Sequence, residues 1–310
     1  MSAATVIALM GATATGKTDL AIAIAERFAV EIISVDSALI FRDMNIGTAK
    51  PEPEVLASVP HHLIDIVDPA DAWSVWDFLE QSRRLVSEIH ARGRIPLLAG
   101  GTMMYFHAFQ HGLNRLPAAN PEIRQRLDAE TRELGLAALH ERLARIDPQS
   151  AERIRATDRQ RIQRALEVCE LAGEPLSQLQ RQRTRGYAGT IEKVILAASN
   201  RALLHQRIYT RFMSMLEQGF VEEVESLRRR KDLDLSLPSM RCVGYRQIWQ
   251  YLDGDSNREQ MIESAVAATR QLAKRQITWL RKQNSAGVHD CLNYSKDAIF
   301  RQLEAAGLSP

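Results

Sequence analysis

The chain has 310 residues and a formal net charge of +2, with 45% hydrophobic and 25% charged residues. These values lie in the ordinary range of globular proteins and exclude disordered, collagen-like and membrane-embedded classes. The longest apolar runs are far too short to span a bilayer and the N-terminus lacks a signal-peptide pattern, so we expect a cytoplasmic protein with no membrane partner. The three widely separated cysteines indicate neither a disulfide framework nor a zinc site.

The charges are unevenly distributed along the chain. Residues 1–112 carry 8 Lys and Arg against 13 Asp and Glu, whereas residues 113–310 carry 32 against 25. A basic second half indicates a polyanionic partner, but helix faces with uneven solvated charge would give the same counts. Composition alone leaves both interpretations open.

The first part of the chain alternates between short apolar runs and amphipathic stretches. The apolar runs predict strands at 5–10, 31–36, 62–67 and 95–99, and helical spacing predicts helices at 18–28 and 75–91. Strands that alternate with helices are typical of a doubly wound parallel sheet. Ligands of such sheets bind beyond the carboxyl ends of the strands, where Gly11, Asp36 and Gly100 all fall.

The pattern changes after residue 115. Residues 116–185 predict short helices rich in Arg and Glu, and the next strand is predicted at 191–198. We therefore expect a helical insertion domain at 116–185 within a core formed by residues 1–115 and 186–310. The core ends in a helical C-terminal region, with helices predicted at 203–216, 221–229, 245–252 and 259–281.

The turn after the first predicted strand carries a phosphate-binding sequence. It fits G-x-x-x-x-G-K-[ST] between a predicted strand and a predicted helix, which is the context that this motif requires. Glycines let backbone N–H groups close around phosphate oxygens, Lys17 adds a positive charge, and Thr18 can ligate Mg²⁺. The pattern indicates an α/β core like that of the P-loop nucleoside-triphosphatases. The loop consists of Gly11, Ala12, Thr13, Ala14, Thr15, Gly16, Lys17 and Thr18.

A carboxylate is expected opposite this P-loop, because phosphoryl transfer normally uses a strand-end Asp to hold the metal. The strand at 95–99 ends in Gly100-Gly101-Thr102 and offers no carboxylate, whereas the strand at 31–36 ends in Asp36-Ser37. Asp36 is therefore the candidate functional carboxylate. Its alternative role is a turn or helix cap, which Asp also favours.

Two later segments carry basic residues at helical spacing. Arg161 and Arg164 lie one turn apart, and Lys274, Thr278 and Arg281 share one helical stripe. Such stripes can follow a phosphate backbone. Taken in isolation, they are more often solvated faces.

Together these features resemble the tRNA dimethylallyltransferase family, also called tRNA isopentenyltransferases, in its bacterial form. The matches keep their order along nearly the whole chain. Two departures are Ala12, where Pro is common, and residues 38–41, where a more polar stretch is common; neither removes a group that the chemistry needs. Besides the P-loop and Asp36-Ser37, the matching sequences are Ile46-Gly47-Thr48-Ala49-Lys50-Pro51, His61-His62-Leu63-Ile64-Asp65, Gly100-Gly101-Thr102 with Tyr105, Asp158-Arg159-Gln160-Arg161 with Arg164-Ala165-Leu166-Glu167, Gly219-Phe220-Val221-Glu222-Glu223-Val224, Gly244-Tyr245-Arg246 and Arg275-Gln276-Ile277-Thr278-Trp279.

The resemblance implies that the P-loop holds the diphosphate of dimethylallyl diphosphate rather than ATP, although ATP binding stays an open question. The dimethylallyl group passes to the exocyclic 6-amino group of the adenosine immediately 3′ of a tRNA anticodon, and diphosphate leaves. It further implies Asp36 as the base and Thr102 as a hydrogen-bonding partner of the amine or the leaving oxygen. Lys17 and a Mg²⁺ ion on Thr18 would neutralise the diphosphate. A monomer that binds the anticodon stem-loop is expected.

The resemblance also implies a set of tRNA contacts, carried over position by position. Three alternatives remain: a small-molecule kinase or nucleoside-triphosphatase, a prenyltransferase acting on free AMP or ATP, and a non-catalytic RNA-binding protein. A kinase leaves the basic segments unexplained, a free nucleotide needs no extended basic surface, and a binding protein does not need Lys17, Thr18 and Asp36 together. The implied tRNA contacts are Asp36, Ser37, Ala38, Leu39, Thr102, Arg124, Gln160, Arg161, Ile162, Gln163, Arg164, Arg241, Cys242, Val243, Gly244, Tyr245, Arg246, Lys274, Arg275, Gln276, Ile277, Thr278, Trp279, Leu280 and Arg281.

Overall fold

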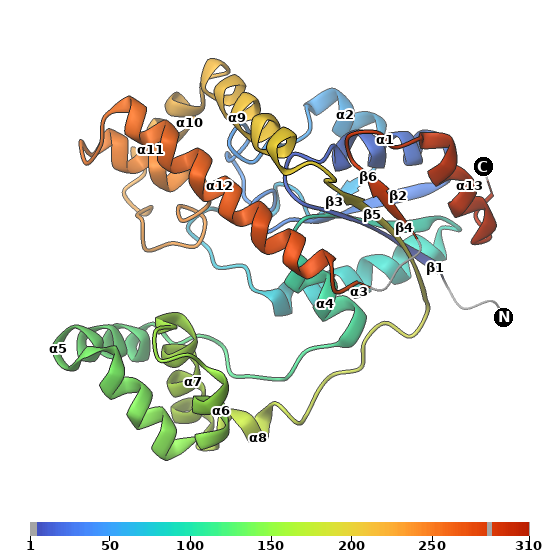
Figure 1. Cartoon of the computed structure of the whole chain (residues 1–310). Helices are drawn as coiled ribbons and strands as arrows, with labels where there is room; N and C mark the ends of the chain where they lie inside the picture. Colours follow the sequence, from blue (N-terminus) through green and yellow to red (C-terminus); the bar gives the residue numbers. More distant parts are fainter. Residues whose placement is uncertain (1–4, 284–286, 310) are drawn as a thin grey trace. The chain divides into compact units, whose positions relative to one another are not determined.

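The computed structural model describes residues 5–283 and 287–309, and the chain divides into two compact units (Figure 1). The first unit combines Met1–Phe109 with Ala188–Pro310, and the second is Gln110–Tyr187. The insertion expected at 116–185 lies inside the second unit, whose bounds extend slightly beyond it at both ends.

The first unit is built on a six-stranded parallel sheet with the strand order β3-β2-β4-β1-β5-β6. In register, Gly100 lies beside both Met10 and Val35, so the carboxyl ends of β1, β2 and β4 meet at one edge. The predicted α/β class with a parallel sheet is confirmed. The strands are β1 (Thr5–Gly11), β2 (Val30–Val35), β3 (His61–His62), β4 (Ile95–Gly100), β5 (Thr190–Ala197) and β6 (Val288–Asp290).

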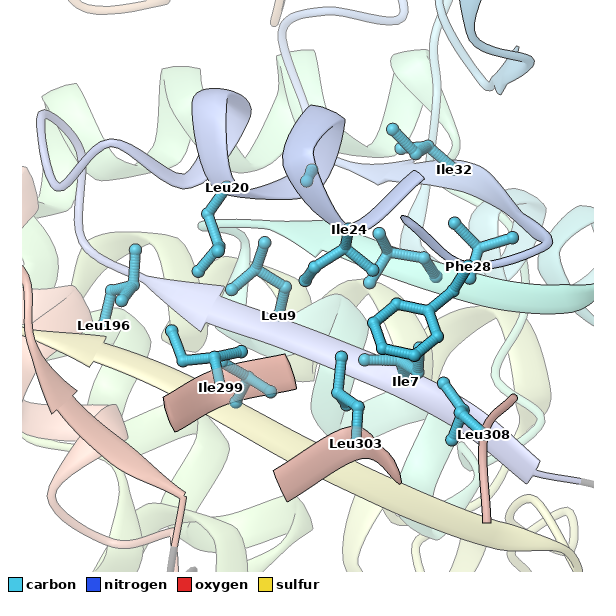
Figure 2. Packing of buried hydrophobic residues seen from close by; sticks show 14 of the residues in the cluster. Ile7, Leu9, Leu20, Ile24, Phe28, Ile32, Leu196, Ile299, Leu303 and Leu308 are labelled. Atoms are coloured by element: carbon cyan, nitrogen blue, oxygen red, sulfur yellow. The ribbon is translucent and has the colours of Figure 1, made fainter. Parts of the chain in front are cut away.

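Helices cover both faces of this sheet, and the central strand is therefore buried on both sides. Figure 2 shows Leu20 of α1 (Lys17–Arg27) and Ile299 of α13 (Lys296–Ala305) directed at Leu9 of β1. Val6 and Ala8, which point to the opposite face, are also buried. Burial on both faces explains why β1 is apolar from Val6 to Met10 instead of alternating.

The remaining helices of the first unit follow the periodicity of the sequence closely. α3 begins where it does because the Ser74 side chain accepts the Asp77 N–H while the Asp77 carboxylate accepts the Ser74 N–H. The predicted helices at 75–91, 203–216, 221–229, 245–252 and 259–281 are confirmed to within two residues at each end. They are α3 (Val75–Ala91), α9 (Arg201–Glu217), α10 (Phe220–Arg228), α11 (Tyr245–Leu252) and α12 (Arg258–Leu280), and to them the structure adds α2 (Pro53–Ser58) and α4 (Met103–His111).

The second unit is helical and has its own core. Its helices are α5 (Pro121–Ile146), α6 (Pro148–Arg153), α7 (Arg159–Ala172) and α8 (Leu176–Leu179). Leu127 and Leu143 of α5 pack with Ile162 and Leu166 of α7. α5 is interrupted at Gly135, whose φ of 82° is not helical.

The strand predicted at 62–67 is wrong beyond its first residue. Leu63 and Asp65 have φ values of 62° and 55°, in a left-handed region that no regular strand uses. The backbone N–H groups of Ile66 and Val67 donate instead to the carbonyl of Ile40 in the loop after β2. The sequence prediction also missed α2, α4, β6 and α13; β6 is only three residues long, α2 only six, and α4 is apolar on most of its surface.

Among the described residues, none of the helices combines the length and the apolarity that crossing a membrane requires.

Candidate active site

The P-loop turns sharply between β1 and α1. Ala14 and Gly16 have φ values of 62° and 80°, which bend the backbone around the start of α1. The Lys17 Nζ donates to the carbonyl of Ala12 at 2.6 Å, and the Thr15 hydroxyl donates to the same carbonyl at 2.8 Å. No side chain caps the N-terminus of α1, so its first backbone N–H groups are available to an anion.

Lys17 lies in an electrostatic group with Asp36 and Arg211. Burial lowers the pKa of Lys17 to about 8, while the Asp36 carboxylate opposes this shift and the Arg211 guanidinium adds to it. Burial also lowers the pKa of Arg211, against the attraction of Asp36 and Asp19. No hydrogen bond or ion pair to another described residue engages the Arg211 side chain. Both cations thus feel Asp36, and Arg211 also feels Asp19, but no direct ion pair forms among the described residues, which suits a ligand with more than one negative charge.

Asp36 uses one carboxylate oxygen to shape the backbone. Its Oδ1 accepts the N–H groups of Ala38 at 2.8 Å and Leu39 at 3.4 Å. This oxygen therefore caps the turn, which was the alternative role considered for Asp36. The second oxygen, Oδ2, has no hydrogen-bond partner within residues 5–283 and 287–309, so the same side chain can cap a turn and still accept a proton.

Thr102 ties the end of β4 to the end of β2. Its backbone N–H donates to the carbonyl of Val35 at 3.0 Å, and its Oγ1 accepts the N–H of Ser37 at 3.1 Å. Thr102 therefore lies beside Asp36-Ser37, as expected for two residues that follow neighbouring parallel strands.

A cavity of about 830 Å³ lies between the loop at 45–56 and α9. Arg211 lines this cavity and also belongs to the charged group around Lys17. Ile46, Leu56 and Met215 contribute apolar wall, and Lys50 contributes a further cation. The cavity thus borders the P-loop site through Arg211, and its walls carry apolar, basic and acidic side chains, the acidic ones from Glu52 and Asp65.

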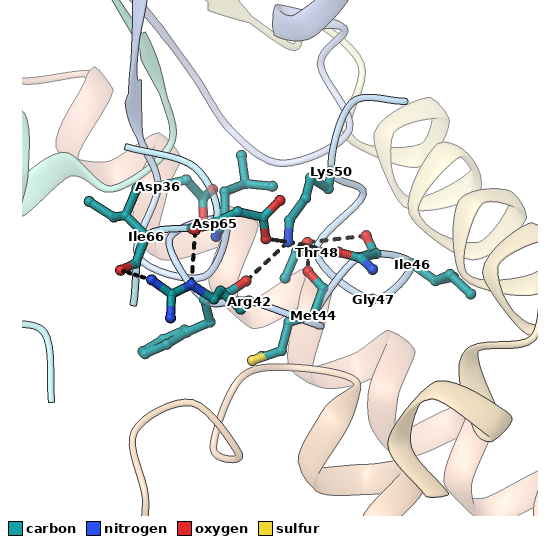
Figure 3. Close-up of polar contacts among 12 residues, drawn as sticks. Asp36, Arg42, Met44, Ile46, Gly47, Thr48, Lys50, Asp65 and Ile66 are labelled. Carbon is teal, nitrogen blue, oxygen red and sulfur yellow. Dashed lines mark hydrogen bonds and ion pairs between the residues drawn. The ribbon is translucent and has the colours of Figure 1, made fainter. Parts of the chain in front are cut away.

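Lys50 fixes one end of the segment 45–56, which lines the cavity (Figure 3). Its Nζ donates to the carbonyl of Phe41 at 3.0 Å and to Asn45 Oδ1 at 2.8 Å, and it forms an ion pair with Asp65. Arg42 in turn donates to the backbone carbonyls of Asp65 and Ile66. The signature sequences at 46–51 and 61–65 are therefore parts of one folded loop pair.

Glu223 fixes the other end of this loop. Its carboxylate accepts the three successive backbone N–H groups of Asn45, Ile46 and Gly47 at 2.9, 2.7 and 3.2 Å. The Tyr245 hydroxyl donates to Glu223 Oε1 at 2.6 Å. Tyr245 is buried, so its side chain offers no surface to RNA, contrary to the expectation drawn for it from the resemblance.

Crowding by two aromatic rings explains why the signature at 46–51 has glycine at position 47. A Cβ at Gly47 would lie 2.1 Å from the ring of Phe220 and 2.5 Å from the ring of Tyr245. The two rings meet edge to face, with centroids 4.9 Å apart. Three separated signatures, at 46–51, 219–224 and 244–246, therefore form one structural contact.

The residues expected to contact tRNA include buried, half-buried and exposed side chains. In the second unit, Arg124 and Arg164 both bind the carboxylate of Glu167, which is fully buried. Arg161 is exposed and, among the described residues, forms an ion pair only with Asp158 of its own helix turn. Besides Tyr245, the buried members of the expected set are Ile162, Gly244, Gln276 and Leu280, and the exposed members are Ser37, Arg124, Gln160, Arg161, Arg241, Arg246, Lys274, Arg275, Thr278 and Arg281.

Metal ligands are few at this site. Within the part of the chain that is described, no three His, Cys, Asp or Glu side chains are grouped to hold a metal. Thr18 is exposed at the start of α1, so its hydroxyl can reach a metal ion that a bound phosphate holds. Mg²⁺ in phosphate sites is commonly held by one or two protein oxygens and completed by phosphate oxygens and water, so this donor set fits it.

Sequence reasoning missed Arg211. Leu204, Ile208 and Phe212 define the buried face of α9, and Arg211 follows Ile208 by three positions and Leu204 by seven. It therefore occupies an apolar position of an amphipathic helix. An unpaired cation at such a position is the signal that could have identified it.

Comparison with known proteins gives a consistent result. The family model for IPP transferase matches residues 39–283. A tRNA dimethylallyltransferase of Burkholderia cenocepacia is 55% identical over 305 residues, covering 97% of this chain and 94% of that protein. One from Alkalilimnicola ehrlichii is 57% identical over 278 residues, covering 90% and 88%. The crystal structure of a tRNA isopentenylpyrophosphate transferase from Bacillus halodurans is 35% identical with a TM-score of 0.67, covering 98% of this chain and 96% of that one.

Proposed function

Because the chain belongs to the IPP transferase family, we propose that its P-loop site joins the dimethylallyl group of dimethylallyl diphosphate to the exocyclic 6-amino group of the tRNA adenosine 3′-adjacent to the anticodon. Prenyl transfer to tRNA is the activity of the family. The observation that carries the assignment to these residues is the meeting of Lys17, Arg211 and Asp36 at the carboxyl edge of the sheet.

The donor diphosphate binds at the start of α1. Lys17 and Arg211 supply two positive charges, and the free backbone N–H groups of the first helical turn supply hydrogen bonds. The prenyl group lies along the apolar wall of the cavity that borders Arg211, at Ile46 and Met215. The cationic P-loop site next to the apolar side chains of the cavity supports a prenyl diphosphate over a nucleoside triphosphate.

The reaction exchanges one bond for another. The amine nitrogen bonds to C1 of the dimethylallyl group while the C1–O bond breaks and its electron pair leaves with the diphosphate. The amine is a poor nucleophile because its lone pair is delocalised into the adenine ring, so transfer of its proton to Asp36 Oδ2 lowers the barrier. Thr102 orients the amine or the leaving oxygen, and Lys17 and Arg211 neutralise the departing charge.

Thr18 would hold Mg²⁺ together with the diphosphate oxygens. When bound, the ion adds positive charge at the leaving group. The protein groups keep their own tasks: Lys17 and Arg211 bind the diphosphate, and Asp36 accepts the proton.

The tRNA binds through exposed basic side chains of both units. In the first unit these are Lys274, Arg275 and Arg281 at the end of α12, and in the second unit Arg161 on α7. Such contacts to phosphate position the anticodon arm without reading its sequence. The target base leaves its stack to reach the half-buried carboxylate of Asp36. We propose that the protein does this as a monomer, with residues 116–185 as a tRNA-contacting insertion.

A single transfer assay tests the proposal. The protein is incubated with Mg²⁺ and dimethylallyl diphosphate labelled in the prenyl group, together with unmodified tRNA, AMP or ATP. Label is expected in the unmodified tRNA and not in AMP or ATP. A control tRNA whose adenosine 3′ of the anticodon is replaced by guanosine is expected to gain no label. Label in AMP or ATP would make the protein a nucleotide prenyltransferase, and equal labelling of the control tRNA would refute the proposed target.

A further inference from the structure

Gln276 is a buried polar residue on α12 whose amide makes two long-range hydrogen bonds. Its Oε1 accepts the N–H of Thr13 in the P-loop at 2.9 Å. Its Nε2 donates to the carbonyl of Gly101 at 2.9 Å. The residue is only 9% exposed, so its amide is largely shielded from water that could replace these bonds.

Gly101 provides the space that this amide occupies. A Cβ at Gly101 would lie 2.5 Å from Gln276 Nε2, too close for any real contact. The φ of Gly101 is not in the left-handed region, so its backbone conformation does not itself demand glycine. The amide of Gln276 is therefore the reason that a side chain is excluded here.

The two bonds require an amide in one orientation. The amide oxygen must face the Thr13 N–H and the amide nitrogen must face the Gly101 carbonyl, because a flipped amide would oppose donor to donor and acceptor to acceptor. A buried polar group without its partner is costly, so the bonds hold the two backbone segments at a set separation.

We propose that Gln276 is a positioning residue for prenyl transfer: it fixes the P-loop, which carries Lys17, to the turn that carries Thr102. This inference rests on the proposed function. In that reaction the P-loop holds the leaving group and Thr102 faces the attacking amine, so a shift between them misaligns the reacting atoms. Gln276 therefore supports the transfer step through the backbone, although the resemblance had placed it among the tRNA contacts.

The same turns of α12 that carry Gln276 also carry exposed side chains. Lys274, Arg275 and Thr278 lie on the solvent side of α12, where tRNA is proposed to bind, while Gln276 points inward. One helix thus joins the RNA surface to the donor loop. Removal of the amide should change the transfer rate and leave the RNA surface intact.

The test compares Gln276→Met with Gln271→Met, an exposed glutamine on the same helix. Methionine keeps the length of the side chain and removes both amide bonds. With wild-type transfer to tRNA established first, Gln276→Met is expected to lower kcat by about 10- to 100-fold, the scale of small misalignments, with the Kd for tRNA changed less than about twofold. Gln271→Met is expected to behave as wild type. Unchanged kcat in Gln276→Met would overturn the inference, and so would an effect confined to the Kd for tRNA.

Gly101→Ala tests the same contact from the other side. The added methyl group must displace the Gln276 amide, so Gly101→Ala should reproduce the loss of kcat, and Gly101→Ala with Gln276→Met should be no slower than the worse single variant. Additive losses would show that the two residues act separately and would overturn the inference. This variant also decides the matter if Gln276→Met does not fold. Absence of transfer by the wild-type protein would instead refute the proposed function.

Discussion

The two units hold their charged side chains in different ways. In the second unit, arginines are paired with acids: Arg124 and Arg164 share Glu167, and Arg126 forms an ion pair with Glu170. In the first unit, the charged groups at the P-loop meet backbone instead. Lys17 donates to a carbonyl, and Asp36 accepts N–H groups from the following turn.

This difference separates charge that builds the fold from charge that is free to bind a ligand. The second unit is rich in arginine, but part of that charge is neutralised within its own core. The P-loop region is poorer in basic residues, yet Lys17 and Arg211 carry charge that no carboxylate of residues 5–283 and 287–309 pairs with directly. A count of basic residues therefore overstates the RNA-binding capacity of one unit and overlooks the anion-binding capacity of the other.

The largest effect is expected from Asp36→Asn. Asparagine keeps an oxygen that can accept the Ala38 N–H, so the turn should persist while the proton acceptor is lost. Turnover should fall by roughly 10² to 10⁴, the usual contribution of general-base catalysis. Single-turnover transfer measures this loss, with donor and tRNA titrations to show that binding is retained. The control is Asp43→Asn, which alters an exposed carboxylate nearby. Near-normal turnover would remove Asp36 from the role of base.

Lys17→Met should come next, with a loss of roughly 10² in kcat/KM for the donor, the scale of one lost charge-stabilising donor. Methionine retains the apolar stem and removes the ammonium group, so both donor affinity and rate should fall. Titration with inorganic pyrophosphate and steady-state kinetics measure the two parts. A change in tRNA affinity alone would contradict the assignment of the P-loop to the donor.

The pH dependence of kcat/KM for the donor should follow the protonation of Lys17. Burial lowers its pKa to about 8, so the cation is present below that pH and is lost as the pH rises through it. For the free enzyme, kcat/KM for the donor should therefore decline above about pH 8, by about tenfold per pH unit. In Lys17→Met this decline should disappear. A wild-type profile that stays flat to pH 10 would show that the Lys17 charge is not required.

Glu167→Ala should destabilise the second unit without affecting donor binding. Burial disfavours the charged form of Glu167, but bonds from Arg124, Arg164 and the Asn120 N–H still hold its pKa below the usual range. The stabilisation is thus present near neutral pH and is lost as the pH falls through that lowered pKa. Removal of the carboxylate should cost about 3 kcal/mol, at the low end for a buried pair because both arginines are partly exposed.

Hydrogen exchange of residues 110–187 measures the loss of stability in Glu167→Ala. Glu133→Ala, at an exposed position of the same unit, is the matched control. Equal protection in the two variants would mean that the Arg124 and Arg164 pairs do not stabilise the unit.

Arg161→Glu should give the smallest effect, confined to RNA. Its side chain is 73% exposed, and within the part of the chain that is described it forms an ion pair only with Asp158. tRNA affinity should fall, and the slope of log Kd against log salt should decrease by about 1 for each lost phosphate contact. Arg164→Glu provides the contrast, because Arg164 binds buried Glu167 and should lower stability as well. If Arg161→Glu lowered stability and left the salt slope unchanged, the RNA contact would be refuted.

Local sequence patterns were sufficient for most of the elements. The helix at 75–91 was predictable because its period is regular and its capping residues are adjacent in sequence. The strand at 62–67 was not, since its backbone turns left-handed at Leu63 and Asp65 under contacts with the loop after β2. Residue type and apolar period do not encode such loop contacts.

The residues of the site also fall into those that local patterns locate and those that they do not. The P-loop, Asp36 and Thr102 follow strand ends, so motif and topology together locate them. Gln276 reaches Thr13 across 263 positions, and no local pattern marks that contact. Residues that act through distant partners require the fold before their roles can be inferred.

The hydrogen bonds from the backbone at 45–47 to Glu223 have a consequence for ligand design. Because an internal carboxylate already holds these three N–H groups, the wall of the cavity is formed before any ligand arrives. A molecule that fills the cavity need not order this loop, so the conformational-entropy cost of binding is small. The occupied N–H groups also cannot bind a second anion. Rigid inhibitors that extend from the P-loop should therefore fill the cavity with apolar groups and reserve their negative charge for Lys17 and Arg211.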